Sequence, residues 1–252
     1  MSTIHDSGSI QDPYYTTGAF HEHSSGAADA AFKVAQLVRL LRTQSEHHVP
    51  RLRRIADVGC GAGATTVELA TALRGFGVDM VDGYDLHPGI NELPDRENVC
   101  FQRVDFATVD VIPYDLVVLF DVVEHVPDPI GFLRSAGARG RLVALHFPLD
   151  KSMFNGLRGE WRKKLKQPGH LICLDIPGAL SVAAMAGLRS IDYLTTPVFR
   201  APSGALTRNQ KLLNPVRRTL YAVSPYLLQA TLGGVGLMLL ARSLLGMQPE
   251  GG

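Results

Sequence analysis

Three glycines at alternate positions, Gly59, Gly61 and Gly63, follow an apolar segment that ends near Asp57. Two threonines come next and open a helix-like segment, so the order of residue types predicts a strand, a tight turn and a helix N-terminus. Glycine has no side chain to hold a ligand away, and the N–H groups of such a turn can approach a bound molecule closely. We therefore expect this turn to begin a ligand-binding site.

The glycine turn alone is compatible with two kinds of ligand. Its spacing also satisfies the relaxed G-x-G-x-x-G/A fingerprint of dinucleotide-binding proteins. Asp57 favours a ligand with a cationic amine, because a carboxylate at this place would repel a pyrophosphate. Asp85 ends the next predicted strand, where an acid can accept hydrogen bonds from a ribose, but both kinds of ligand carry a ribose. An NAD(P)-dependent oxidoreductase is thus an alternative, although no Tyr-x-x-x-Lys set for hydride transfer is evident.

A regular alternation of strands and helices must position these residues. We predict strands at 54–58, 80–84, 99–104, 116–120 and 142–147, with helices at 65–73 and 130–136. Mostly apolar strands separated by helices imply a parallel sheet that is covered on both faces. In such sheets ligands bind outside the carboxyl ends of the strands. Four acids fall at or near those ends: Asp57, Asp85, Asp105 and Asp121.

Further elements are expected on both sides of this alternation. Residues 1–50 are predicted to form a mobile arm and an amphipathic cap helix at 27–42. After residue 150 we predict a helix at 176–186, a strand at 189–194, an insertion of turn residues at 195–225 and a last strand at 236–242. The uncharged run at 219–241 is long enough to span a membrane. Pro225, Gln229 and three glycines interrupt it, so we favour a helix followed by a buried strand.

The composition excludes several classes of protein. The chain has 252 residues and a formal net charge of +1, which gives no reason to expect nucleic acid as a partner. Three scattered cysteines argue against a disulfide framework or a zinc site and suit a reducing cytoplasm. The polar N-terminus has no secretory signal, and we expect a cytoplasmic protein.

Four segments in order, DVGCGAG, YD, VDF and LVVLFDVVEHVPDP, resemble a class I S-adenosylmethionine-dependent methyltransferase over residues 54–148. The resemblance implies S-adenosylmethionine as the cofactor. It also implies an α/β fold, a seven-stranded Rossmann-like sheet with helices on both faces and an antiparallel last strand. The methyltransferase domain would cover residues 51–246, with substrate-lid inserts at about 150–170 and 195–230, and residues 247–252 would be a disordered tail.

The resemblance also implies roles for single residues. Asp57 and the turn residues Gly59, Gly61 and Gly63 would hold the methionine moiety of the cofactor. Asp85 would bind the ribose hydroxyls. Asp105, with Phe106 beside it, would contact the adenine, and Asp121 would begin the loop beside the sulfonium.

The EHVPDP segment is similar to the small-molecule branch of this family, which includes the O-methyltransferases of quinone biosynthesis. This implies a small-molecule acceptor, methylated at oxygen. Some members have an acid-x-x-Glu-His arrangement proposed to bind a divalent metal, which here is Asp121, Glu124 and His125. The same residues occur in relatives where they only pack the loop, and we assign no metal. The NPPY-type motif of DNA amino-methyltransferases is absent, which also argues against nucleic acid.

Methylation of oxygen requires a base, and a histidine is suited to this near neutral pH. His125 and His146 are the candidates, against the alternative that both make structural hydrogen bonds. The basic segment at 151–166 is a solvated helix face or a surface for an acidic acceptor, a lipophilic acceptor with a polar head, or a membrane. A binding protein that keeps the fold without catalysis is a further alternative. The sequence gives no indication of the oligomeric state.

Overall fold

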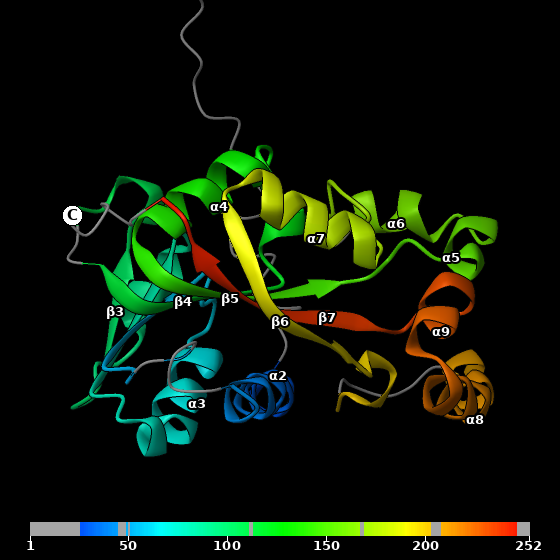
Figure 1. Cartoon of the computed structure of the whole chain (residues 1–252), viewed down its shortest axis with the longest axis horizontal. Coiled ribbons are helices and arrows are strands. Elements are labelled where there is room, and N and C mark those ends of the chain that lie inside the picture. Colours follow the sequence, from blue (N-terminus) through cyan, green and yellow to red (C-terminus); the bar gives the residue numbers. More distant parts are fainter. Residues whose placement is uncertain are drawn as a thin grey trace, which may run out of the picture.

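The computed structural model describes residues 26–44, 49, 51–110, 113–166, 169–202 and 208–245. The predicted mobile arm at 1–26, except for Gly26, and the predicted tail at 247–252 lie outside the described residues. One sheet of seven strands, in the order β3-β2-β1-β4-β5-β7-β6, forms the centre of the molecule (Figure 1). Its strands are β1 (Arg54–Val58), β2 (Met80–Asp85), β3 (Val99–Arg103), β4 (Tyr114–Phe120), β5 (Gly140–Pro148), β6 (Leu188–Thr196) and β7 (Gly236–Ser243).

Helices cover both faces of this sheet. The longer ones are α2 (Ala27–Arg42), α3 (Ala64–Ala72), α4 (Pro129–Ala138), α7 (Ile176–Met185) and α8 (Arg208–Val223). Shorter ones are α5 (Met153–Leu157), α6 (Glu160–Lys166) and α9 (Pro225–Thr231). Single 3-10 turns occur at Arg74–Phe76, Pro88–Glu92, Phe106–Thr108, Val123–His125 and Val198–Arg200. Viewed as in Figure 1, α2 and α3 lie below the sheet and α4 and α7 lie above it.

The two faces of the sheet build two separate cores. Along β4, Leu116 and Val118 pack with α2 and α3, whereas Val117 and Leu119 pack with α4 and α7. This alternation follows from the two-residue period of a strand. Because both faces are buried, the strand is continuously apolar, which is the pattern that the sequence showed.

The strand order reverses between β1 and β4, which pair in parallel. β2 and β3 follow on one side of this point, and β5 on the other. Ligands of doubly wound sheets bind at the carboxyl ends of the strands where the order reverses. β7 runs antiparallel to both β5 and β6, so the predicted fold is confirmed, including its antiparallel last strand.

Most predicted elements are confirmed within two residues, and α2, β1 and the start of β7 fall where predicted. The prediction of turn residues across 195–225 missed α8, which contains Pro215 in its interior. Within 219–241 the structure has the end of α8, then α9, then β7, as the favoured alternative required. No helix among the described residues is both long enough and apolar enough to cross a bilayer.

Candidate functional site

The glycine turn after β1 has the backbone shape that the sequence predicted. Gly59, Gly61 and Gly63 all have positive φ, at 76°, 55° and 78°. A Cβ at Gly59 would lie 2.4 Å from Cγ2 of Val122, a residue that follows β4. Gly59 is therefore required twice, once by its left-handed backbone and once by the close approach of the loop after β4.

Asp57 lies at the base of the turn and is 2% exposed. The hydroxyl of Thr66, at the start of α3, donates a 2.7 Å hydrogen bond to its Oδ2. Burial raises the pKa of Asp57 to about 7, although this hydrogen bond opposes the shift. A buried carboxyl that titrates near neutrality is suited to accept a cationic ligand group, which would complete its ion pair.

Asp85, at the end of β2, joins the turn to the neighbouring strand. Its Oδ2 accepts a 2.7 Å hydrogen bond from the N–H of Gly61, and its Oδ1 accepts one from the N–H of His87. The carbonyl of Tyr84 accepts from the N–H groups of Gly59 and Cys60. Asp57, Asp85 and the three glycines are thus brought together at one edge of the sheet, as the sequence predicted from strand order.

Asp105 and Phe106 follow β3 but differ in direction. The carboxylate of Asp105 accepts from the N–H of Ala107 and caps a short 3-10 turn. The ring of Phe106 is 3% exposed and packs against Tyr84, with 5.0 Å between the ring centroids. The ring of Phe106 is thus held in the core, and the predicted contact of Asp105 and Phe106 with an adenine stays a prediction. The position can reach a ligand only through its backbone.

Asp121, directly after β4, is the one non-glycine residue with positive φ, 54°, in the described part of the chain. Lys33 of α2 lies 2.6 Å from its Oδ2 and 2.5 Å from Asp29, and its own side chain is 10% exposed. Burial opposes ionisation of Asp121, but Lys33 and His146 together hold its pKa well below the usual range. This ion pair fastens α2 to the loop after β4 and stabilises the strained residue.

His146, on β5, has both ring nitrogens engaged. Its Nδ1 lies 2.5 Å from Oδ1 of Asp121 and must donate, because an ionised carboxylate only accepts. Its Nε2 lies 2.9 Å from the hydroxyl of Thr196 on β6, which then donates. The imidazole is 1% exposed. The sequence predicted His146 at the edge of the sheet where the ligand binds. In the structure, His146 belongs to a series of polar contacts that runs from Lys33 through Asp121 and His146 to Thr196.

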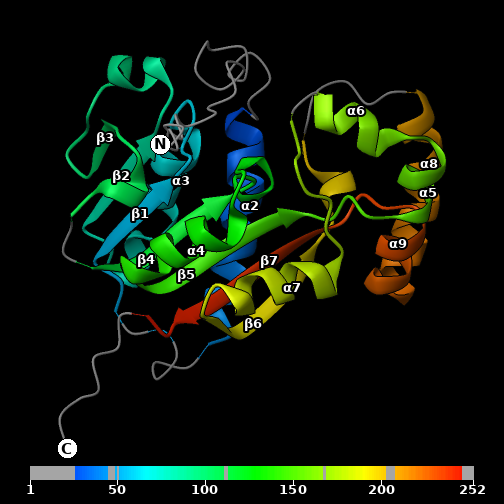
Figure 2. The ribbon, with the colours of Figure 1, turned by 90° about the horizontal axis from the view of Figure 1, so that it is seen from above.

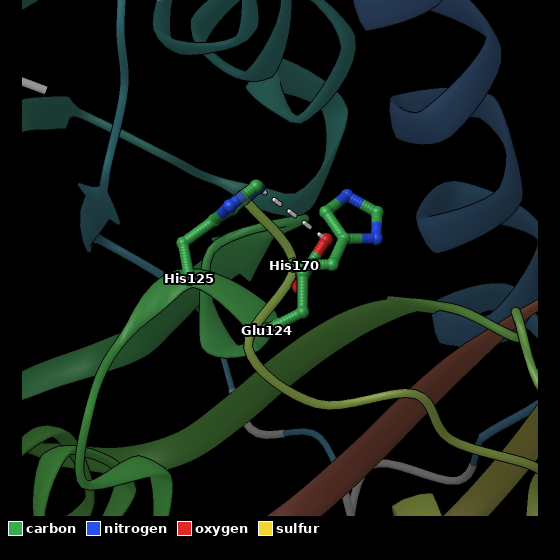
Figure 3. Close-up of side chains that lie close together, drawn as sticks. All are labelled: Glu124, His125 and His170. Atoms are coloured by element: carbon green, nitrogen blue, oxygen red, sulfur yellow. Dashed lines mark ion pairs between the residues drawn. The ribbon is translucent and has the colours of Figure 1, made fainter. Parts of the chain in front are cut away.

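A second cluster, shown in Figure 3, consists of Glu124, His125 and His170. One ligand-type atom of each residue lies within 4.8 Å of those of the other two. Glu124 is 2% exposed, and neither of its carboxylate oxygens has a hydrogen-bond partner in the described part of the chain. Burial and the charge of Asp121 raise its pKa well above the usual range. A buried carboxyl in this state is stabilised by a proton or by a cation.

The two histidines of the cluster have defined tautomers. The Nδ1 of His125 lies 3.3 Å from the carbonyl of Gly169, and the Nδ1 of His170 lies 2.7 Å from Oδ2 of Asp150. Each of these nitrogens must donate, so each Nε2 is the basic nitrogen of the neutral ring. Burial and the nearby His170 lower the pKa of His125 to about 4, so this imidazole is neutral at physiological pH.

This cluster differs from the metal set that the sequence suggested. Both oxygens of Asp121 are engaged by Lys33 and His146, so Asp121 does not join Glu124 and His125. His170, from the segment after α6, takes its place. Two imidazoles and a buried carboxylate fit a divalent cation, and Asp150 behind His170 is the kind of outer carboxylate that orients metal-binding histidines.

Sequence reasoning missed Lys33, Thr66, Asp150 and Thr196 and gave no preference to His170. A lysine beside the apolar stripe of α2 was one available signal, because Lys33 directly precedes the buried Val34. Asp150 and Thr196 gave no comparable signal, since their partners are 20 and 50 residues away in sequence.

Comparisons with known proteins agree with this geometry. Residues 30–181, more than half of the chain, match a family model described as a methyltransferase domain. The ubiquinone biosynthesis O-methyltransferase of Neisseria meningitidis serogroup C is 33% identical over 91 residues, and that of Bordetella bronchiseptica is 30% identical over 90. The first match covers 34% of this chain and 38% of that relative, and the second covers 34% and 37%.

Among solved structures, magnesium protoporphyrin IX methyltransferase from Synechocystis PCC 6803 has the same fold. Its structure with bound SAH aligns with a TM-score of 0.56 at 17% identity, covering 93% of this chain and 98% of that one. Its structure with bound SAM gives a TM-score of 0.53 at 15% identity, covering 93% and 95%.

Proposed function

The chain belongs to the methyltransferase-domain family, and from this premise we propose that it transfers the methyl group of S-adenosylmethionine to a hydroxyl oxygen of a small, lipophilic molecule. The observation that carries the proposal is the arrangement of Asp57, the glycine turn and Asp85 at the reversal of strand order. The Synechocystis structures with bound SAH and SAM support the same donor here. The names of the curated relatives support oxygen as the accepting atom.

We propose that the chain holds the donor by its amino acid and ribose ends. Asp57, which titrates near pH 7, pairs with the ammonium group, and the N–H groups of the glycine turn lie against the methionine moiety. Asp85 accepts from the ribose hydroxyls, and the backbone at Asp105 and Phe106 meets the adenine. The bound donor supplies a methyl group that is already activated by the positive sulfur, so the protein contributes alignment and exclusion of water.

We assign the general base to His125 rather than His146. Both ring nitrogens of His146 are engaged inside the core, Nδ1 by Asp121 and Nε2 by Thr196, whereas Nε2 of His125 belongs to the cluster with Glu124 and His170. As the bond from oxygen to carbon forms and the bond from sulfur to carbon breaks, the acceptor hydroxyl gives its proton to Nε2 of His125. His146, Asp121 and Lys33 act as positioning residues for the loop after β4.

A divalent cation held by Glu124, His125 and His170 is the second arrangement that this cluster supports. Such an ion would lower the pKa of an acceptor hydroxyl. The test is calorimetric titration of the purified chain with Zn²⁺ or Mn²⁺, which needs no turnover. If the ion binds, Glu124→Gln should lower its affinity by at least about tenfold, because substitutions of metal ligands or of the residues that orient them lower metal affinity by that much. If Glu124→Gln and the unchanged chain bind the ion with equal affinity, Glu124 is not a ligand and the proposed cation site is contradicted.

The other expectations stay predictions with partial support. The net charge of +1 supports a small acceptor over nucleic acid. The three cysteines are free, as a reducing compartment such as the cytoplasm would keep them. An NAD(P)-dependent oxidoreductase is not favoured, given the family and Asp57.

The function is tested with S-adenosylmethionine labelled in its methyl group, incubated with the chain and either a lipid extract or an aqueous extract of cells. We expect label in one small lipophilic product as an O-methyl group. His125→Ala should lower its formation by about a hundredfold, the usual contribution of a general base, while still binding S-adenosylhomocysteine. Label in the nucleic acid or protein fraction, or binding of the cofactor product without transfer to any extract, would contradict the proposal.

A further inference from the structure

Large apolar side chains are exposed mainly at one end of the molecule. Fourteen such side chains are exposed in the described part of the chain, and ten of them lie at residues 153–171 and 212–227. Leu157 is 81% exposed, Leu212 is 78% exposed and Val223 is 75% exposed. Such gathering is unusual for a surface that faces only water, where apolar residues are scattered.

The helices that carry nine of these ten residues, all except Leu171, lie together. α5 contacts both α6 and α9, and α9 contacts α8. In both views the four helices occupy the same end of the molecule, beyond the end of β5 (Figures 1 and 2). In α8, Leu212, Val216 and Val223 are four and seven residues apart, so they share one exposed face. We call this end, formed by α5, α6, α8 and α9, the apolar–basic end.

Its charge is positive. Arg158, Arg162, Lys163 and Lys166 are exposed on α6 and just before it, and their one acidic neighbour, Glu160, is paired with Arg158 and Lys163. In the sequence of α8 and α9, residues 208–231, no acidic residue occurs, whereas four arginines and lysines do. Exposed apolar side chains with basic residues around them are the combination that binds the interface of anionic lipids.

We propose that the apolar–basic end docks on the surface of an anionic lipid bilayer. No helix in the described ranges could cross the bilayer, so the contact is peripheral, with apolar side chains entering the headgroup region and basic ones meeting lipid phosphates. A second copy of the chain fits this end less well, because a symmetric contact would place mostly like charges opposite each other, and Glu160 is already paired within its own chain. The inference concerns a partner and stands independently of the proposed reaction.

Co-sedimentation of the full chain with vesicles tests the proposal. Vesicles of phosphatidylcholine with about one third phosphatidylglycerol should bind at least about tenfold more strongly than phosphatidylcholine alone. Raising the salt from about 0.1 M to about 0.5 M should reduce this preference, because the charges are exposed. The double variant Leu157→Glu with Val223→Glu should lose at least about tenfold in binding, since it places carboxylates where apolar side chains must enter.

Met185→Glu is the matched control, because Met185 is 64% exposed at the end of α7, outside the apolar–basic end. It should change vesicle binding by less than about twofold. Thermal unfolding and calorimetry with S-adenosylhomocysteine establish that all variants are folded. If only the binding of S-adenosylhomocysteine failed, the proposed methyl transfer would be contradicted and the docking proposal would be unaffected. Absence of binding to anionic vesicles, or equal loss in Met185→Glu, would overturn the proposal. A dimer that Val223→Glu abolishes, without vesicle binding, would assign this end to a second copy.

Discussion

The glycine turn after β1 and the charged network after β4 lie against each other, since Gly59 approaches Val122, but they are stabilised differently. In the turn, backbone N–H groups are satisfied by the carbonyl of Tyr84 and the carboxylate of Asp85. Its residues come from two short segments of sequence, 57–66 and 84–87. Its shape depends on positive φ, which glycine adopts without cost.

The network after β4 is assembled instead from distant segments. Lys33 comes from α2, His146 from β5, Thr196 from β6 and His170 from the segment after α6. Its stability depends on charges that neutralise each other, and neither carboxylate oxygen of Glu124 has a hydrogen-bond partner among the described residues. The comparison teaches that the glycine turn is fixed by local backbone shape, whereas the network after β4 depends on tertiary electrostatics.

The largest effect is expected from Lys33→Met. This change removes the buried ammonium group that pairs with the buried Asp29 and the half-buried Asp121, and breaking a largely buried pair in this way costs about 3 kcal/mol in the free energy of unfolding. Urea unfolding measures it. Lys163→Met, which removes an exposed pair with Glu160 on α6, is the matched control and should cost less than about 1 kcal/mol. If Lys33→Met and Lys163→Met lowered the free energy of unfolding equally, the contacts of Lys33 with Asp29 and Asp121 would not be a major source of stability.

Gly59→Ala tests the backbone side of the comparison. The new Cβ would lie 2.4 Å from Val122 in a backbone with φ of 76°, so we expect a loss of about 2 kcal/mol and weaker binding of S-adenosylhomocysteine. Gly75→Ala is the control, because no atom lies within 4 Å of its Cβ position. Combining Gly59→Ala with Val122→Ala should restore the part of the loss that comes from the clash. No loss in Gly59→Ala would contradict the close approach.

The affinity for S-adenosylhomocysteine should depend on pH through Asp57. Its carboxyl must be ionised to pair with the ammonium group, and its pKa is raised to about 7. Affinity should therefore fall by up to about tenfold per pH unit below about pH 7 and level off above it. Asp57→Asn should bind weakly with little pH dependence. A flat profile in the unchanged chain would show that Asp57 does not meet the ligand charge.

The smallest effect is expected from Glu124→Gln in the presence of a chelator. Burial raises the pKa of Glu124, so its contribution to stability is complete below the ordinary carboxyl pKa and is lost as the pH rises through the raised value. The variant has no such loss. Its free energy of unfolding, relative to that of the unchanged chain, should therefore rise by at most about 1.4 kcal/mol per pH unit between the ordinary and the raised pKa. Urea unfolding at about pH 5 and about pH 6 measures the difference, which is at most about 1.4 kcal/mol over this interval. A gain that shrinks with rising pH would contradict the assignment.

The same contrast explains what the sequence could predict. The strands, the parallel order and the turn with Asp57 and Asp85 were accessible because periodicity and glycine spacing are local. Lys33, Asp150 and Thr196 were not, because their roles depend on which segments pack together. The burial of the Phe106 ring was not accessible either, because sequence position does not show toward which side of the chain a side chain points. α8 was missed because Pro215 usually ends a helix.

The central claim, that the turn and its acids bind the donor of methyl transfer, is tested most directly by calorimetric titration of the full chain with S-adenosylhomocysteine and, separately, with NAD. We predict one site per chain for S-adenosylhomocysteine, no binding of NAD, and a loss of at least about a hundredfold in Asp85→Ala, which removes a charged hydrogen-bond partner. Binding of NAD in place of S-adenosylhomocysteine, or unchanged affinity in Asp85→Ala, would contradict the account.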